Sequence, residues 1–128
     1  MGVLNTLLII DDNEILLNAI DDYFSKRNYK VYASTNGLDA LKLLETHGEA
    51  IDLIITDLIM PNISGVGIIS IAKKKYPKIP VIAITGWGEH PEALAAEANA
   101  DKIIEKPIKL NKLEDVIKDM LAQKNLNK

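Results

Sequence analysis

The stretch Leu7-Leu8-Ile9-Ile10-Asp11-Asp12 decides the fold class of this chain. Side chains alternate between the two faces of a β-strand, so four large apolar residues in a row predict a strand that is buried on both faces. Such strands are typical of parallel sheets that carry helices on either side. The two aspartates end the apolar run, which is therefore too short for a membrane span or for the core of a signal peptide.

The same pattern recurs along the chain and alternates with helical segments. Further short apolar runs lie at Leu53-Ile54-Ile55, Val81-Ile82-Ala83-Ile84 and Ile103-Ile104, with a weaker run, typical of an edge strand, at Val31-Tyr32-Ala33. Helical spacing of apolar residues occurs at Leu16, Ala19, Ile20 and Tyr23, at Leu41 and Leu44, at Ile68, Ile69 and Ala72, at residues 93–98, and at Leu113, Val116, Ile117 and Met120. This order predicts an α/β fold: a single doubly wound five-stranded parallel sheet in the order 2-1-3-4-5, flanked by five helices, with flavodoxin-like topology.

Length, charge and composition narrow the function classes. The 128 residues suffice for one domain, predicted to span 1–128 with a core of about 6–122 and a tail at 123–128. The formal net charge of −3 argues against a non-specific nucleic-acid binder. The chain has no cysteine, which excludes disulfides, thiol catalysis and Cys-based zinc sites. No targeting segment is recognisable, so we expect a cytoplasmic protein with no membrane partner.

Polar residues follow the predicted strands at the ends where parallel sheets bind ligands. Asp11 and Asp12 follow the first strand, Asp57 ends the third, Thr85 ends the fourth and Lys106 follows the fifth. We therefore expect three carboxylates, a hydroxyl and an ammonium at one edge of the sheet. One lysine compensates only one of three negative charges, and a hard divalent cation such as Mg²⁺ is the natural complement. The same surroundings suit a phosphoryl group during transfer.

Each of these residues also has a plain structural interpretation. An Asp-Asp pair after a strand can cap the next helix, and a single Asp before a loop can form a turn. A Thr at a strand end is commonly structural, and the pair Lys106-Pro107 can simply end a strand. The run Lys73-Lys74-Lys75 is interpreted as a solvated helix terminus that complements the helix dipole. The conjunction of five such residues at one edge is what favours a functional site.

Four short motifs follow one another in a fixed order. They are Ile9-Ile10-Asp11-Asp12, then Thr56-Asp57-Leu58-Ile59-Met60-Pro61 with Gly65, then Ile84-Thr85-Gly86, and then Glu105-Lys106-Pro107. With this set the chain resembles the receiver domain of bacterial two-component response regulators, of the chemotaxis-regulator type, from about Leu7 to about Leu121. Each motif alone is weak, but the ordered set at this spacing is specific.

The resemblance implies a phosphoacceptor switch in a phosphorelay, not an enzyme with a substrate of its own. Asp57 would accept a phosphoryl group from a sensor histidine kinase or a phosphotransfer protein. The resemblance further implies that Mg²⁺ would be held by Asp11, Asp12, Asp57 and the backbone carbonyl of Ile59. Lys106 would pair with the carboxylate or phosphoryl oxygens.

Residues around this centre would form the switch. The resemblance implies that Thr85 hydrogen-bonds the phosphoryl group, that Gly86 leaves the phosphodonor a path, and that Lys106-Pro107 is a cis peptide. Asn99 stands where the family usually has glycine, and asparagine is expected to keep the left-handed conformation there.

Other positions depart from the family's usual pattern. Ile103 stands where an aromatic residue usually couples to the threonine, and a β-branched side chain is stiff and has no ring. We expect that coupling to be lost, or Ile103 to be ordinary edge-strand packing. Ile59 and Trp87 stand two residues after the phosphoacceptor and the threonine, where neither readily orients a water. Slow hydrolysis of phospho-Asp57 is therefore expected, unless Trp87 is merely a surface aromatic.

The expected output is a change in the face formed by the fourth helix, the fifth strand and the fifth helix. That face would control binding of a downstream effector protein or homodimerisation, and this domain would bind no nucleic acid. A phosphorylation-independent, receiver-like interaction module stays open as an alternative. A Mg²⁺-dependent phosphohydrolase of the haloacid dehalogenase type would need a general-acid Asp where Ile59 stands. The sequence leaves open the kinase, the signal, and whether the chain is part of a longer protein.

Overall fold

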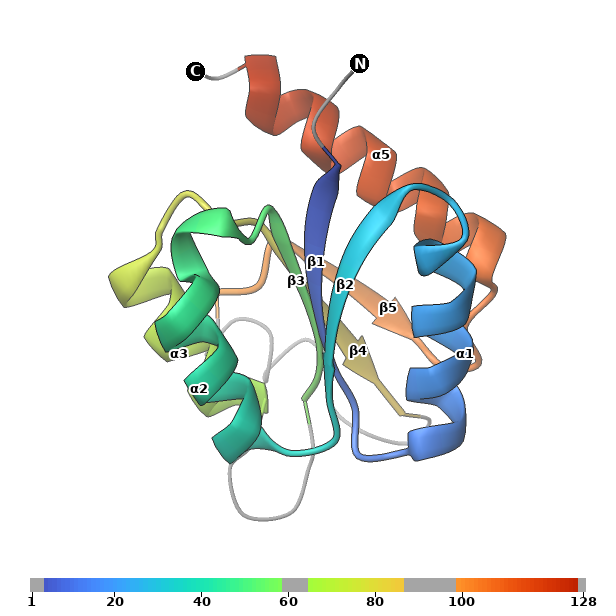
Figure 1. Ribbon diagram of the computed structural model, residues 1–128, viewed down its shortest axis with the longest axis horizontal. Helices are drawn as coiled ribbons and strands as arrows, with labels where there is room; N and C mark the ends of the chain where they lie inside the picture. Colours follow the sequence, from blue (N-terminus) through green and yellow to red (C-terminus); the bar gives the residue numbers. More distant parts are fainter. Residues whose placement is uncertain (1–3, 59–64, 87–98, 127–128) are drawn as a thin grey trace.

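The computed structural model of this chain describes residues 4–58, 65–86 and 99–126 (Figure 1). Its strands are β1 (Asn5–Ile10), β2 (Tyr29–Ser34), β3 (Leu53–Asp57), β4 (Val81–Thr85) and β5 (Lys102–Glu105). Its helices are α1 (Glu14–Ser25), α2 (Gly37–His47), the short 3-10 helix η1 (Gly48–Ala50), α3 (Gly65–Lys75) and α5 (Leu110–Leu126). The helix predicted at 93–98 lies outside the described residues. α5 runs to Leu126, into the segment that was expected to be a tail.

The five strands form one parallel sheet in the order β2-β1-β3-β4-β5. This confirms the predicted α/β class and strand order. The weak run at residues 31–33 lies in the edge strand β2, as expected. The register pairs Ile10 with Thr56 and Asp57 with Ile84, so the carboxyl ends of neighbouring strands end level with one another. All of them lie at one edge of the sheet, the lower one in Figure 1.

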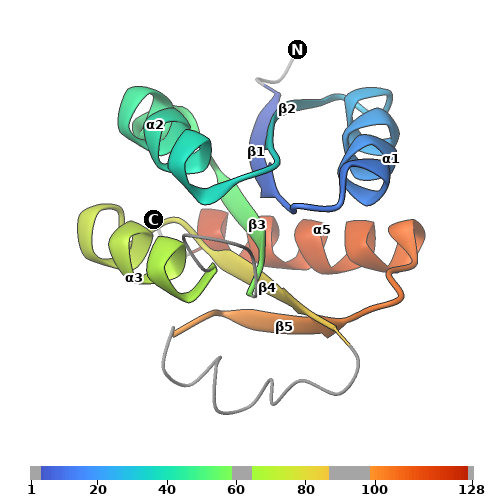
Figure 2. The ribbon, with the colours of Figure 1, turned by 90° about the horizontal axis from the view of Figure 1, so that it is seen from below.

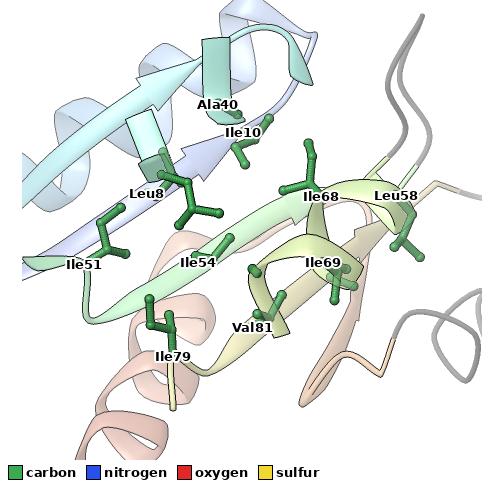
Figure 3. Packing of buried hydrophobic residues seen from close by; sticks show 13 residues of the cluster. Leu8, Ile10, Ala40, Ile51, Ile54, Leu58, Ile68, Ile69, Ile79 and Val81 are labelled. Atoms are coloured by element: carbon green, nitrogen blue, oxygen red, sulfur yellow. The ribbon is translucent and has the colours of Figure 1, made fainter. Parts of the chain in front are cut away.

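Helices cover both faces of the sheet, as the unbroken apolar runs require (Figure 2). In β1, Leu8 and Ile10 pack towards α2 and α3, whereas Leu7 and Ile9 pack towards α1 and α5. All four side chains are fully buried. Figure 3 shows the α2–α3 side, where Ile68 of α3 lies among the strand residues. Burying a large apolar side chain contributes about 1.5–3 kcal/mol, so a polar residue at any of these positions would be costly.

The buried face of α1 differs from the predicted one. Ile20 is buried as expected, but Leu17 and Phe24 join it while Ala19 is exposed. Leu16 and Tyr23 are half-buried and pack against the same cluster, so the turn of the helix towards Leu17 and Phe24 is smaller than one residue step of about 100°. This turn buries the large ring of Phe24, which packs edge-on against Tyr29 with ring centroids 5.3 Å apart. An aromatic ring removes much more apolar surface from water than an alanine methyl, and this difference decides the orientation.

A buried carboxylate joins α1 to α5. Glu114 of α5 accepts a hydrogen bond of 2.9 Å from the Tyr23 hydroxyl and bonds of 3.1 Å from Arg27 Nε to both of its oxygens. The Arg27 guanidinium also lies 4.7 Å from the centre of the Tyr23 ring. Burial by itself would raise the pKa of Glu114, but the hydrogen bonds from Tyr23 and Arg27 and the nearby positive charges outweigh it and hold the pKa below its usual value.

This contact predicts a pH-dependent contribution to stability. A lowered folded-state pKa means that the contribution is full above the unfolded-state pKa of about 4.5 and is lost as the pH falls through the folded-state value. Glu114→Gln is expected to lower the free energy of unfolding at pH 7 by roughly 1 kcal/mol, a low value because the Arg27 side chain is half exposed. Urea unfolding at pH 7 and at pH 3 would check this. A difference that stays constant or grows towards acid pH would contradict it.

No helix within the described residues is both long enough and apolar enough to cross a membrane.

Candidate functional site

The predicted site residues lie together at the carboxyl edge of the sheet. Asp57 is the last residue of β3 and Thr85 the last of β4, while Asp11 and Lys106 directly follow β1 and β5. The register places Asp11 level with Asp57, because the residues before them, Ile10 and Thr56, are partners. Sheet geometry alone thus brings four short segments, distant in sequence, to one place.

Asp11 is held in a fixed orientation although it is fully buried. Its Oδ1 accepts a 2.8 Å hydrogen bond from the backbone N–H of Asn13, and its own N–H donates to the Ser34 carbonyl at 3.1 Å. Burial raises the pKa of the Asp11 carboxyl, and the charge of Asp57 raises it further; the Asn13 N–H and Lys106 oppose this shift without cancelling it. The groups around Asp11 therefore do not fully compensate the charge of its buried carboxylate.

The N-cap of α1 is Asn13, not one of the two aspartates. Its side-chain oxygen accepts from the N–H of Leu16 at 3.2 Å. The plain structural interpretation of the Asp-Asp pair as a helix cap is therefore wrong. Asp12 is exposed and follows the buried Asp11. Neither carboxylate caps α1.

Lys106 supplies the positive charge of the site. Its Nζ lies 3.0 Å from Asp57 Oδ2, to which it donates a hydrogen bond, and 3.5 Å from Asp11 Oδ2. Burial would lower the pKa of Lys106, but the hydrogen bond and charge of Asp57, with the charge of Asp11, outweigh it and raise the pKa above its usual value. Lys106 is therefore a permanent cation between two carboxylates.

Three carboxylates can converge on one ion here. One oxygen each of Asp11, Asp12 and Asp57 lies within 4.8 Å of the others. Lys106 balances one of the three negative charges. Asp11 Oδ2 is buried and accepts no hydrogen bond from the described residues, and its one ion pair, with Lys106 Nζ at 3.5 Å, is long, so the oxygen keeps capacity for a further ligand. An oxygen-only donor set with excess negative charge fits a hard divalent cation such as Mg²⁺.

Thr85 places a hydroxyl beside this cluster. It is fully buried, and its Oγ1 has no hydrogen-bond partner among the described residues. The backbone carbonyl of Thr85 accepts from the N–H of Lys106 at 2.8 Å, which ties the ends of β4 and β5 together. A buried hydroxyl without a partner is costly, and such groups commonly serve a ligand.

Gly65 stands against the backbone of Asp57. Its N–H donates to the Leu58 carbonyl at 3.0 Å, and a Cβ at this position would lie 1.9 Å from the Asp57 carbonyl oxygen. Only glycine permits α3 to begin this close to the end of β3. The Thr56 hydroxyl also donates to the Asp57 carbonyl, at 3.0 Å. The sequence motif contains Gly65 but gives no sign of this contact or of the role of Thr56.

The structure describes only some of the remaining residues that were predicted for the site. Ile59 and Trp87 lie outside the described residues. Gly86 and Ile103 are half-buried, and the peptide bond between Lys106 and Pro107 is cis, as expected. Ile103 belongs to neither hydrophobic cluster among the described residues.

Asn99 has a φ of 62°. The expectation of a left-handed residue before β5 is confirmed.

Comparison with known proteins identifies the family. The family model described as "Response regulator receiver domain" matches residues 7–118. The chain belongs to this family. The expected resemblance is thereby confirmed, and the chain is a receiver domain of the kind found in two-component response regulators.

Among curated proteins, this receiver domain is similar to the sensor kinase CckA of Brucella abortus (strain 2308), with 27% identity over 123 residues. It is also similar to the response regulator SaeR of Staphylococcus aureus (strain USA300), with 31% identity over 118 residues. The matches cover 94% and 91% of this chain, but only 13% of CckA and 50% of SaeR. The receiver domain thus spans half or less of the length of these relatives.

Solved structures of the family superpose closely on the receiver domain. A response regulator receiver domain protein from Clostridium thermocellum matches with a TM-score of 0.90 and 28% identity, covering 98% of this chain and 100% of the other. A CheY-like receiver domain protein from Methanospirillum hungatei JF-1 matches with a TM-score of 0.89 and 25% identity, covering 98% and 99%. The sheet and helices described above are those of the family.

Proposed function

We propose that the chain is a phosphoacceptor switch in a two-component phosphorelay, with Asp57 as the residue that carries the phosphoryl group. The observation that supports this most directly is the contact of Asp57 Oδ2 with the Lys106 ammonium inside a cluster of three carboxylates. Asp57 is nearly buried, at 4% exposure. A nucleophile held in one orientation beside a cation is suited to in-line attack on phosphorus.

Asp11, Asp12 and Asp57, with the backbone carbonyl of Ile59, are the proposed ligands of Mg²⁺. When bound, the ion would neutralise charge on the phosphoryl oxygens during transfer. A carboxylate oxygen of Asp57 attacks the phosphorus of a phosphohistidine, the P–N bond breaks, and the freed imidazole takes up a proton. Lys106 holds the attacking carboxylate before transfer and a phosphoryl oxygen after it.

Thr85 is the proposed sensor of the phosphoryl group. Its buried hydroxyl has no partner among the described residues, so a new acceptor oxygen on Asp57 would give it one. Movement of Thr85 would then change Gly86, Trp87, Ile103 and the segment after Pro107, which belong to the proposed output region.

The proposed partners follow from the phosphoryl chemistry and from the relatives. A sensor histidine kinase or a phosphotransfer protein would donate the phosphoryl group, and an effector protein or a second copy of the chain would bind the altered face. Since CckA is a sensor kinase and SaeR a response regulator, receiver domains occur in both kinds of protein. We place the protein in the cytoplasm, as one domain whose last helix continues to Leu126, beyond the expected core of about 6–122, and without a substrate to turn over.

Incubation of the purified chain with acetyl phosphate and MgCl₂ tests the proposal. Intact-protein mass spectrometry is expected to show a gain of about 80 Da, the mass of one phosphoryl group. The gain should disappear when EDTA replaces MgCl₂, and in Asp57→Ala. Asp52→Ala is a matched control, because Asp52 lies at the opposite end of β3 and should leave labelling intact. Equal labelling of Asp57→Ala would overturn the assignment, and absence of any labelling would favour a phosphorylation-independent interaction module.

A further inference from the structure

A groove lies at the amino ends of the strands, at the opposite end of the sheet from the carboxylate cluster. It has a volume of about 660 Å³, which is within the range of ligand-binding pockets. Its walls are the end of α3 with the connection to β4, the beginning of β5, and α5 from Val116 to Lys124. These segments lie on the same side of the molecule in Figure 2, at the left. We call it the lysine groove and define it by Lys73, Lys78, Lys102, Val116, Met120 and Lys124.

Positive charge dominates this groove although the chain as a whole has a net charge of −3. Four lysines line it, against two aspartates, Asp101 and Asp119. Asp101 is already engaged, because it pairs with Lys73 and accepts a 2.7 Å hydrogen bond from the N–H of Val81. Lys124 is also paired, because its Nζ lies 3.7 Å from Asp52 Oδ1. The remaining excess of ammonium groups, Lys78 and Lys102 against Asp119, favours an anionic occupant.

Two of the lysines are fixed and two are free to bind. Lys73 is held by Asp101 and by the Ile79 carbonyl, and Lys124 donates to the Asp52 carbonyl at 3.3 Å. Lys78 and Lys102 are exposed and form no ion pair with another described residue. These two ammonium groups stand on different elements of the groove and are both available to an anionic occupant.

The groove also offers apolar surface. Val116 and Met120 of α5 are only half-buried, and together with Pro77 and Pro80 they line it. An apolar side chain that covered them would bury surface now facing water. Methionine adapts readily to the shape of such a side chain.

We propose that the lysine groove binds an acidic peptide segment of a partner protein that carries at least one large apolar side chain. The acidic side chains lie towards Lys78 and Lys102, and the apolar side chain lies against Val116 and Met120. A peptide can pair with the free lysines and at the same time cover Val116 and Met120, which a small anion cannot. The proposal goes beyond phosphoryl transfer and does not depend on it, because the groove is complete with Asp57 unmodified.

Binding can be measured with the full chain and a synthetic peptide in which pairs of Glu alternate with Leu and Phe. Fluorescence anisotropy gives the affinity, and ¹H–¹⁵N spectra of the labelled chain locate the contact. Saturable binding is expected, with shifts concentrated at Lys78, Lys102, Val116 and Met120. A second peptide with Gln in place of Glu should bind at least about tenfold more weakly, because only the acidic peptide complements the charge. Binding should also weaken as salt is added.

A pair of double variants separates the groove from the overall charge. Lys78→Glu with Lys102→Glu is expected to weaken binding by about tenfold or more, since two attractive contacts become repulsive. The control variant Lys30→Glu with Lys42→Glu makes the same change in total charge, but on β2 and α2, at the edge strand opposite β5. It should leave the affinity for the peptide within about twofold of the unmodified chain.

The following results would overturn the proposal: no saturable binding up to about 1 mM peptide, a value typical of very weak complexes; shifts clustered elsewhere; equal binding of the Gln peptide; or equal weakening by both double variants. Inorganic phosphate and citrate serve as small-anion probes. If either produces the same shifts and the peptide binds no more tightly, the groove takes small anions and the peptide proposal is wrong.

Discussion

Asp11→Asn is expected to make the metal-free chain more stable and to remove its response to Mg²⁺. The Asp11 carboxylate is fully buried, faces Asp57, and leaves one oxygen without a hydrogen bond among the described residues. Asparagine removes the buried charge but keeps an oxygen that can accept from the Asn13 N–H. The free energy of unfolding in EDTA should rise by roughly 1–3 kcal/mol, the cost of a buried group without full compensation.

The same change should weaken the metal site, because one of its three carboxylates is lost. At a Mg²⁺ concentration one hundred times the dissociation constant, binding would stabilise the unmodified chain by about 2.7 kcal/mol. Asp11→Asn should lose most of that gain. Urea unfolding in EDTA and in MgCl₂ measures both effects on the same protein.

Asp12→Asn is the matched control for this prediction. Asp12 is exposed, so its replacement should change the stability in EDTA by less than about 0.5 kcal/mol while still weakening the response to Mg²⁺. The pair thus separates the effect of burial from the loss of a ligand. If Asp11→Asn is less stable than the unmodified chain in EDTA, the buried charge of Asp11 does not destabilise the metal-free chain. If Asp11→Asn keeps the full response to Mg²⁺, the proposed metal site is wrong.

Gly65→Ala is expected to destabilise the chain by about 3 kcal/mol or more, the upper end of the cost of overpacking. The new Cβ would stand 1.9 Å from the Asp57 carbonyl oxygen and 2.8 Å from the Leu58 Cα. Both are backbone atoms, so no rotation of a side chain relieves the collision. Either α3 or the end of β3 must move, and a shift of β3 displaces Asp57 from its 3.0 Å contact with Lys106.

Two measurements distinguish this local collision from general damage to the helix. Urea unfolding gives the loss of stability, and the rate of labelling by acetyl phosphate, measured where the variant is still folded, reports on Asp57. Ser70→Ala changes an exposed residue of the same helix and should alter neither quantity appreciably. A Gly65→Ala variant with unchanged stability and labelling would show that the beginning of α3 is not packed as described.

Much of the site could be predicted because it depends on the order of strands and on what ends each strand. Asp11, Asp57 and Thr85 lie at the ends of runs that are buried on both faces, and Lys106 follows the shorter run of the edge strand β5, which is only half-buried. Once the runs form a parallel sheet, their carboxyl ends must meet. The chemistry of the convergent residues then follows from their types.

Contacts between helices could not be predicted in the same way. Lys73 was expected to be solvated with its two neighbours, but its side chain is only 20% exposed and pairs with Asp101, at the beginning of β5. Glu114 was not singled out, although it joins α5 to α1 through Tyr23 and Arg27. Such pairs depend on the relative placement of distant elements, which no local pattern of residues records.

By itself the sequence determined the fold class, the strand order and the set of polar residues at one edge, because strand burial and connection length are local and strongly constrained. Only the tertiary structure decided which face of α1 is buried, that Asn13 rather than an aspartate caps this helix, and that Gly65 touches the backbone of Asp57. It also decided that four lysines from three separate segments line one groove. The physical reason is that these features depend on packing between elements. The local sequence pattern allows several arrangements of the elements, and the buried apolar area and the distances between atoms determine which of them forms.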